Sequence, residues 1–385
     1  MGKLAIFGGK PALNEKPLIA PTVSSSAKKL VIDSLNNGKL SNFEGNGFVS
    51  RFEEEFAKFN ETKYAVCTNS GTSSLHTALA TISLNPEDEV IVPAYTFVSG
   101  ASVVLQERAT PVFADIDKNN YCIDPEDLAN KITKRTKVIM PVHIYGHPAN
   151  MKKINKIAKE FNLSVIEDCA QAHGAKIGTQ NVGTFGIAGC YSFAKTKNMT
   201  TGEGGMIVTN DKFVCEESKI VRQNGKVSWK IHKRLGYNYR MTEMQAAVGL
   251  SQLADLNKIN KIRKKNAEIY FKKLKGLGLI LPTIDSNVTH AFYKLPVLMP
   301  NTLKDKRGVF VKACLGENLP IETGYSIALN KIDFLRGSLP EVSCPVAEDF
   351  VDRVINLPLA PCLSKEQILI ICEGLRKVYN EIDSL

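Results

Sequence analysis

Between residues 64 and 210 the chain alternates short, almost wholly apolar runs with longer amphipathic segments, and this alternation restricts its fold more than any other feature. The apolar runs do not follow a strict apolar/polar alternation, so both faces of the strands they predict have to be buried. They are 64–68, 89–94, 110–116, 137–144, 164–169, 189–193 and 205–210. The segments between them predict helices at 73–84, 96–106, 124–132 and 150–161. Strands that alternate with helices predict a three-layer α/β domain on a mainly parallel sheet.

The flanking segments differ from this pattern. Residues 1 to about 25, with several glycines and prolines, predict an irregular arm, and helices are expected at Ser25–Leu35 and Val49–Phe59. A long helix is expected from Thr242 to about Leu274, with a break near Lys258. Beyond it, short apolar runs, prolines and a final amphipathic helix from Ser364 to Ile382 predict a smaller α+β domain. We therefore expect a large domain over 1–255, arm included, and a small C-terminal domain over 256–385.

Composition limits the environment and the partners of the chain. No apolar run approaches the roughly 20 residues that a membrane-spanning helix needs, and the first residues lack the apolar core of a secretory signal. Nine cysteines are scattered without a CxxC pair, which favours reduced, mostly buried thiols over disulfides or a zinc site. We expect a cytoplasmic protein that neither enters nor binds a membrane.

The net charge of +10 favours anionic ligands, phosphate groups among them. Much of the positive charge lies in the lysine-rich segment 258–275. Nucleic-acid binding is one interpretation of that segment, and a solvated amphipathic helix is the other. Apolar residues recur at helical spacing within it and no nucleic-acid motif accompanies it, so we favour the helix and expect no nucleic-acid partner.

The stretch from Val165 to Gly205 carries the residues with the clearest chemical meaning. Asp168 ends an apolar run, and Ser192, Lys197 and a glycine cluster follow. A carboxylate and an amine on neighbouring strand ends are what pyridoxal phosphate needs: the amine bonds to the cofactor aldehyde and the carboxylate keeps the pyridine nitrogen protonated. Taken singly, an aspartate at the position of Asp168 is also common as a helix cap, and Lys197 alone is equally typical of an ordinary surface lysine.

Two further strand ends offer complementary groups. Strand 64–68 turns through Asn69, Ser70 and Gly71 into a helix near Thr72, and backbone N–H groups at a helix start suit a phosphate, although a plain N-cap has the same pattern. Tyr95 and Phe97 follow another strand, where an aromatic ring either stacks on a flat cofactor or packs in the core. Gln171 lies three residues beyond Asp168 and is within reach of the same ligand.

Taken together, five ordered blocks resemble the sugar aminotransferase family of fold-type I pyridoxal phosphate enzymes, the DegT/DnrJ/EryC1/StrS family. The blocks are NSGTSSLHTAL, VIVPAYTFVS, VIEDCAQAHGA, YSFAKTKNMTTGEGG and LGYNYRMTEMQAAVGL. The resemblance covers about residues 30 to 260 well and the C-terminal third loosely.

The resemblance implies a role for each matched residue. Lys197 resembles the lysine that bonds to the cofactor, Asp168 the partner of the pyridine nitrogen and Gln171 the partner of the ring oxygen. Gly71, Thr72 and Ser192 resemble the residues that hold the cofactor phosphate. Phe97 resembles the aromatic residue that stacks on the cofactor ring, with Tyr95 as the second choice for that role. Asn238 resembles a residue that reaches the phosphate of the neighbouring subunit's cofactor, which implies a homodimer with composite active sites. Arg240 is a nearby candidate for an anion contact or a structural salt bridge.

The implied activity is transfer of an amino group from glutamate or glutamine to a keto-sugar, most often a nucleotide-linked keto-deoxyhexose. Members of the family that dehydrate deoxysugars carry histidine at the lysine position, so Lys197 favours transamination. A keto-cyclitol aminotransferase, a pyridoxal phosphate dehydratase or lyase, and a non-catalytic regulator with the same fold remain alternatives.

The sequence departs from the family pattern at two places. Lys195 stands where a neutral residue is usual, and it either binds a substrate phosphate or is simply exposed. Tyr325 is present in the C-terminal third, but Asn330 stands where the family often has a histidine that approaches the substrate. Substrate recognition therefore stays open at this point.

Overall fold

The computed structural model describes residues 3–19, 21, 23–38, 40–41, 46–336 and 342–384. Its centre is a seven-stranded sheet with the order β1-β9-β8-β5-β4-β2-β3. The strands are β1 (Tyr64–Thr68), β2 (Glu89–Pro93), β3 (Thr110–Ala114), β4 (Thr136–Ile139), β5 (Ser164–Asp168), β8 (Ala188–Ser192) and β9 (Gly205–Thr209). Only β9 runs antiparallel to its neighbours β1 and β8. Every strand predicted between residues 64 and 210 is therefore present, in one mainly parallel sheet.

Both faces of this sheet are buried, which confirms the layered α/β architecture. On β1 and β9, Val66 and Ile207 pack into a core shared with Leu75 and Leu79 of α3 (Gly71–Ala80). The alternate residues of the same strands face the core on the opposite side of the sheet, which holds Phe52 of α2 (Phe48–Asn60) and residues of α8 (Glu243–Leu274). Successive strand side chains point to opposite faces, so strands covered on both sides need apolar residues at every position.

The predicted crossover helices are present, each within a few residues of its expected bounds. They are α4 (Ser99–Gln106), α5 (Pro125–Asn130) and α6 (Met151–Glu160). Asp124 and Asn150 cap the last two with side-chain oxygens that accept backbone N–H groups. An additional helix, α7 (Lys212–Arg222), follows β9. None of the helices within the described ranges combines the length and apolarity required to cross a bilayer.

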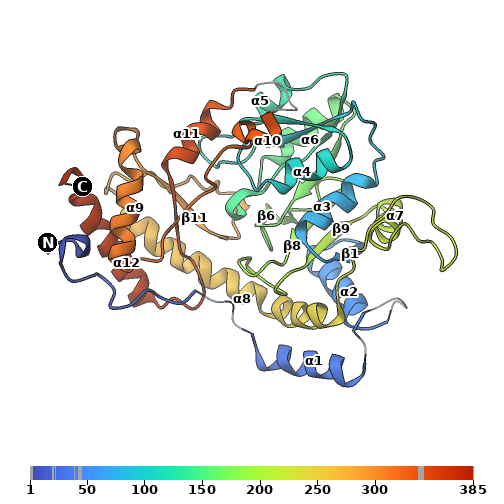
Figure 1. Ribbon diagram of the computed structural model, residues 1–385, viewed down its shortest axis with the longest axis horizontal. Coiled ribbons are helices and arrows are strands. Elements are labelled where there is room, and N and C mark those ends of the chain that lie inside the picture. The colour runs from blue at the N-terminus through green and yellow to red at the C-terminus, as the bar shows by residue number, and fades with distance from the viewer. Residues whose placement is uncertain are drawn as a thin grey trace.

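A second core lies at the other end of α8 (Figure 1). It is built on the antiparallel sheet β11-β13-β12, with β11 (Leu295–Leu298), β12 (Glu322–Thr323) and β13 (Val354–Leu357). The helices α9 (Arg307–Gly316), α11 (Pro345–Arg353) and α12 (Lys365–Asn380) belong to the same part of the chain, together with the short α10 (Asp333–Arg336). A small sheet of β10 (Val288–Thr289), β6 (Lys176–Ile177) and β7 (Gln180–Asn181) is separate from both.

The helix α8 crosses from one core to the other (Figure 1) without a break. The expected break near Lys258 is wrong: a capping box of Thr242 and Gln245 starts the helix, and no proline or glycine follows Gly249 within it. Leu256 packs in the core of the large sheet, whereas Tyr270 and Leu274 pack in the second core. The proposed boundary between 255 and 256 falls inside this helix.

The N-terminal arm docks on the second core, near the C-terminus (Figure 1). Glu317, fully buried at the end of α9, accepts backbone N–H groups from Ala5 and Ala12, both at 2.8 Å, and forms an ion pair with Lys377 at 2.9 Å. The arm then leads to α1 (Ser25–Asn36), which packs along α8. Apart from the 3₁₀ turn η1 (Ala5–Phe7), its described residues are irregular, as predicted.

Candidate functional site

Three of the predicted site residues meet at one edge of the large sheet. Asp168 ends β5 and Ser192 ends the neighbouring β8, while Gly71 is the first residue of the helix that follows β1. The carboxyl ends of parallel strands are where open α/β sheets bind ligands. The antiparallel β9 starts at the same edge with Gly205, so the glycine cluster also lies there.

The start of α3 packs closely against the end of β8 and the start of β9. A Cβ on Gly71 would lie 2.5 Å from Ser192 Cβ, and one on Gly205 would lie 2.2 Å from the carbonyl oxygen of Ser70. Ser70 caps the helix by accepting Ser73 N–H, and Thr72 is exposed in its first turn. Free N–H groups at a helix start, with the helix dipole behind them, fit a phosphate. This part of the site suits the phosphate of a cofactor.

Asp168 is a buried carboxyl group, 5 % exposed, on a strand fixed from both sides. Its Oδ1 accepts Ala170 N–H at 2.9 Å, and its main chain bonds to Pro141 O and to His143 N–H. Burial raises the pKa of Asp168 above its ordinary value, while the Ala170 bond and the nearby Lys197 charge oppose that rise. A cationic ring nitrogen is the partner such a group needs to stay ionised.

The neighbouring Glu167, which the sequence analysis did not single out, holds the strand end in place. Its two oxygens accept N–H groups from Gly183, Phe185 and Gly186 at 2.7–2.8 Å and contact His143 Nε2 at 3.0 Å. His143 Nε2, a Glu167 oxygen and Cys169 Sγ lie within 4.8 Å of one another, a spacing that a metal ion would also use. Because the Glu167 oxygens are already occupied, we interpret this group as structural support for Asp168.

Gln171 is buried and has partners on both side-chain atoms. Its Oε1 accepts Tyr145 N–H at 2.7 Å and its Nε2 donates to the Tyr325 hydroxyl at 3.0 Å. The Tyr95 hydroxyl contacts that of Tyr145 at 2.5 Å and accepts Tyr325 N–H at 3.2 Å. Tyr325 belongs to the C-terminal third of the chain and packs against the core of the large sheet, so this tyrosine network joins the strand ends to the C-terminal part of the chain.

The two candidate stacking aromatics differ in exposure. Tyr95 is 1 % exposed and packs against Phe350, whereas Phe97 is 54 % exposed, with its ring centroid 6.2 Å from that of Tyr325. Only an accessible ring face can stack on a bound cofactor, so the geometry favours Phe97 for this role and leaves Tyr95 as a core residue.

Lys197 lies on the connection between β8 and β9 and is half-buried. Its Nζ lies 4.7 Å from the centroid of the Tyr293 ring, and Thr196 Oγ1 contacts the Tyr293 hydroxyl at 3.1 Å. Tyr293 was not expected from the sequence, since it lies far along the chain in the loop before β11. Lys195, two residues earlier, is exposed.

The remaining predicted residues lie apart from this cluster or are engaged elsewhere. Asn238 is exposed, and its carbonyl oxygen accepts Asn69 Nδ2 at 3.3 Å, so its segment lies beside the turn that leads into α3. Asn330 is buried and donates to Val342 O and to Glu348 Oε1, both at 2.8 Å. The residue in place of the family histidine therefore anchors its own loop.

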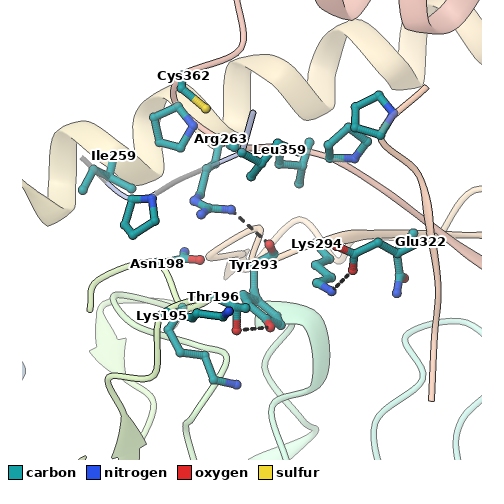
Figure 2. Close-up of a pocket in the computed structure, with 18 of the residues that line it drawn as sticks. Lys195, Thr196, Asn198, Ile259, Arg263, Tyr293, Lys294, Glu322, Leu359 and Cys362 are labelled. Carbon is teal, nitrogen blue, oxygen red and sulfur yellow. Dashed lines mark hydrogen bonds and ion pairs between the residues drawn. The ribbon is translucent and has the colours of Figure 1, made fainter. Parts of the chain in front are cut away.

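A cavity of about 420 Å³ opens beside Lys197 (Figure 2). Its lining includes Lys195, Lys197, Arg263, Tyr293 and residues from 356 to 362, but not Asp168, Gln171 or Ser192. Figure 2 shows Arg263 reaching from α8 toward Tyr293. The cavity therefore adjoins the lysine and is distinct from the cradle at the strand ends.

The fold is that of an enzyme of the pyridoxal phosphate-dependent aminotransferase class. The protein belongs to the DegT/DnrJ/EryC1/StrS aminotransferase family, whose model matches residues 21–376. It is 36 % identical to GDP-perosamine synthase of Escherichia coli O157:H7 over 95 % of this chain and 99 % of that protein. It is 37 % identical to UDP-N-acetyl-3-dehydro-alpha-D-glucosamine 3-aminotransferase of Acidithiobacillus ferrooxidans, over 85 % and 88 % of the two chains.

Solved structures agree with this assignment. The crystal structure of DesV from S. venezuelae matches with a TM-score of 0.88 and 30 % identity over 94 % of this chain and 99 % of that one. The chain is accordingly a sugar aminotransferase by family, and pyridoxal phosphate is its cofactor.

Proposed function

We propose that this enzyme transfers the amino group of glutamate or glutamine to a nucleotide-linked keto-sugar of the keto-deoxyhexose class. The observation that carries the proposal is the combination of a buried carboxyl at Asp168 with a half-buried amine at Lys197, whose charge acts on that carboxyl. Relatives over nearly the whole chain act, by their names, on GDP- and UDP-linked sugars. These names support the nucleotide-linked substrate and leave the sugar itself open.

Each residue of the site has a task in this reaction. Bound here, pyridoxal phosphate supplies the aldehyde that takes up the donor amino group and the ring that accepts electrons. Asp168 holds a proton on the ring nitrogen, and the N–H groups at the start of α3, with Gly71, Thr72 and Ser192, hold the phosphate. Gln171 and Phe97 would help to orient the cofactor ring. Lys197 Nζ would take a proton from the donor α-carbon and return it as a general acid.

Borohydride trapping tests the covalent role of Lys197. The purified protein, incubated with pyridoxal phosphate, should gain a visible absorbance, and reduction followed by peptide mapping should place the pyridoxyl group on Lys197. Lys197→Ala should lose the tag. Lys195→Ala is the matched control, because it removes an exposed lysine two residues away and should keep the tag. A tag on another residue, or none in the wild type, would refute the proposal.

The substrate class needs a separate measurement. We expect ¹⁵N from labelled glutamate or glutamine to appear in a nucleotide-linked sugar when a panel of nucleotide keto-sugars and keto-cyclitols is supplied. Label in a cyclitol alone would replace the sugar proposal with the keto-cyclitol one. Consumption of the keto-sugar without label would indicate a dehydratase or lyase.

We also propose a homodimer in which Asn238 reaches the phosphate site of the partner subunit. Its exposed side chain, on a segment beside Asn69, is available to a second copy. Asn238→Ala should weaken pyridoxal phosphate binding in the homodimer. Heterodimers of Asn238→Ala with Lys197→Ala, produced by co-expression, should regain wild-type affinity at the one site that combines an intact lysine with an intact asparagine. Restoration would fail if Asn238 acted within its own chain.

A further inference from the structure

His76, on α3, is fully buried and has a hydrogen-bond partner on each ring nitrogen. Its Nε2 lies 2.7 Å from Oε1 of Glu107, directly after α4, and its Nδ1 lies 2.9 Å from the Tyr239 hydroxyl. A carboxylate only accepts, so Nε2 carries the hydrogen, and Nδ1 of the neutral ring accepts from Tyr239. Because both nitrogens are occupied away from solvent, the ring holds its neighbours in place rather than exchanging protons with a ligand.

The tyrosines on either side of Asn238 both pack against this histidine. The ring centroid of His76 lies 4.8 Å from that of Tyr237 and 5.7 Å from that of Tyr239. The two tyrosine rings stack on each other at 5.1 Å, with an interplanar angle of 14°. Gln106 Nε2 donates to the Tyr239 hydroxyl at 3.2 Å. This hydroxyl thus donates to one side chain and accepts from another.

The same two tyrosines are also fixed through their backbones. Tyr237 N–H donates to Val221 O at 2.7 Å, at the end of α7. Tyr239 N–H donates to Arg222 O at 3.0 Å, and Tyr239 O accepts Asn69 N–H at 2.8 Å. The segment is therefore bonded on one side to the end of α7 and on the other to the turn that leads into α3.

This arrangement determines the direction in which Asn238 points. Asn238 forms an antiparallel bridge with Gln223, so the backbone here is extended, and successive side chains of an extended segment point to opposite sides. Tyr237 and Tyr239 both face His76, so Asn238 faces away from it, and its side chain is exposed. A side chain held outward from its own subunit is what a contact with the partner's cofactor phosphate requires.

The helix that carries His76 also carries part of the proposed phosphate site. Gly71 and Thr72 lie in the first turn of α3, and His76 lies in its second turn. The phosphate site of a subunit and the segment that presents Asn238 are thus both attached to one short helix. A shift of that helix would displace both together.

We propose that His76, held by Glu107, is a positioning residue that sets Asn238 for the cofactor phosphate of the partner subunit. It acts through the Tyr239 hydroxyl rather than on the cofactor itself. The inference rests on the proposed homodimer with shared sites. It extends that proposal to a buried network on α3 and α4 that lies outside the strand-end cluster.

Tyr239→Phe tests the network with little disturbance, because it keeps the ring and removes only the hydroxyl. The dissociation constant of pyridoxal phosphate, measured by absorbance in the homodimer, should rise by about two- to tenfold, the loss expected for one hydrogen bond. Tyr237→Phe is the matched control. Among the described residues the Tyr237 hydroxyl has no hydrogen-bond partner, so its removal should leave the affinity unchanged.

Two comparisons separate positioning from a general loss of stability. In the Asn238→Ala background, Tyr239→Phe should cause no further loss of affinity, because the side chain that the hydroxyl positions is already absent. His76→Asn keeps an acceptor near the position of Nδ1, so it should bind the cofactor more tightly than His76→Leu. At saturating cofactor, every one of these variants should still trap the pyridoxyl group on Lys197.

Mixed dimers show in which subunit the hydroxyl acts. When Tyr239→Phe is co-expressed with Lys197→Ala, the one site with an intact lysine receives Asn238 from a chain with an intact Tyr239. The affinity of that site should therefore equal that of the wild type. An affinity that stays low would place the effect within the chain that carries the substitution and would overturn the inference.

Two results in the homodimers would also overturn it. One is wild-type affinity in Tyr239→Phe, and the other is a double variant in which the losses of Tyr239→Phe and Asn238→Ala simply add. Either result leaves the proposed transamination intact, since that is judged by cofactor trapping on Lys197. If Asn238→Ala binds the cofactor normally, the positioning role is refuted together with the shared site, and the aminotransferase proposal still stands.

Discussion

Replacing Gly71 with alanine tests whether the cradle depends on backbone packing between α3 and β8. A Cβ at this position would lie 2.5 Å from Ser192 Cβ, 3.0 Å from its Oγ and 3.2 Å from its Cα. Non-bonded carbon atoms are favourably separated at about 3.5–4.0 Å, so the closest contact falls short by roughly 1 Å. Ser192 ends a strand that is paired on both sides, and neither element can move far. Overpacking of this kind lowers the free energy of unfolding by about 1–3 kcal/mol.

The assay is urea denaturation of cofactor-free protein followed by circular dichroism, with pyridoxal phosphate affinity measured by absorbance. Gly71→Ala should unfold at lower urea and bind the cofactor more weakly. Gly308→Ala is the control, because a Cβ there meets no atom within 4 Å and the residue lies in α9. Adding Ser192→Gly to Gly71→Ala removes the contacting Cβ and should recover part of the loss. An unchanged urea midpoint in Gly71→Ala would refute the steric reasoning. So would a double variant whose loss of stability equals the sum of the losses of the two single variants.

Three other substitutions have defined outcomes. Asp168→Asn should stabilise the cofactor-free protein at neutral pH. Because burial raises the pKa of Asp168, the wild type loses stability as pH rises above the ordinary aspartate pKa of about 3.9. The increase in urea midpoint of the variant over the wild type should therefore shrink toward acid pH. A gain that is as large at acid pH, below the ordinary aspartate pKa of about 3.9, as at neutral pH would contradict the assignment. Glu167→Gln should lower the free energy of unfolding by about 3 kcal/mol, because its carboxylate accepts three buried N–H groups, whereas Glu160→Gln on the surface should have little effect in the same denaturation. Thr242→Ala breaks the capping box of α8 and should cost about 1 kcal/mol by thermal or urea unfolding; an unaltered midpoint would show that the cap is dispensable.

The sequence was sufficient to predict the sheet and the residues at its edge, because both follow from local patterns. Runs with apolar residues on both faces had to be covered on both sides, and the carboxyl ends of parallel strands had to lie together. Asp168 was therefore expected at the carboxyl end of a strand, and it does end β5, which pairs in parallel with β8. The roles assigned to these residues in cofactor binding remain predictions until the trapping and binding experiments are performed.

What the sequence left open depends on contacts between distant segments. Tyr95 and Phe97 both follow β2, and only packing against Phe350 and Tyr145 buries one of them. Arg263 lies in a lysine-rich stretch expected to be a solvated face; the neighbouring lysines are exposed as expected, but Arg263 faces the cavity. Charge patterns do not distinguish these cases. Glu167 did offer a signal, since an acidic residue inside an apolar strand needs buried partners.

The docking of the N-terminal arm on Glu317 has a consequence for how the protein is made. The arm leaves the ribosome well before its binding site does, since Ala12 bonds to a carboxylate 305 positions later. At translation rates of about 5–20 residues per second, the arm stays without its partner for roughly 15–60 s. Leu4 and Leu13, which the folded protein buries in the second core, lack that packing during the interval. Folding of this region therefore has to wait until Glu317 has been synthesised, and a change that blocks the arm would interfere with this docking rather than with the sheet.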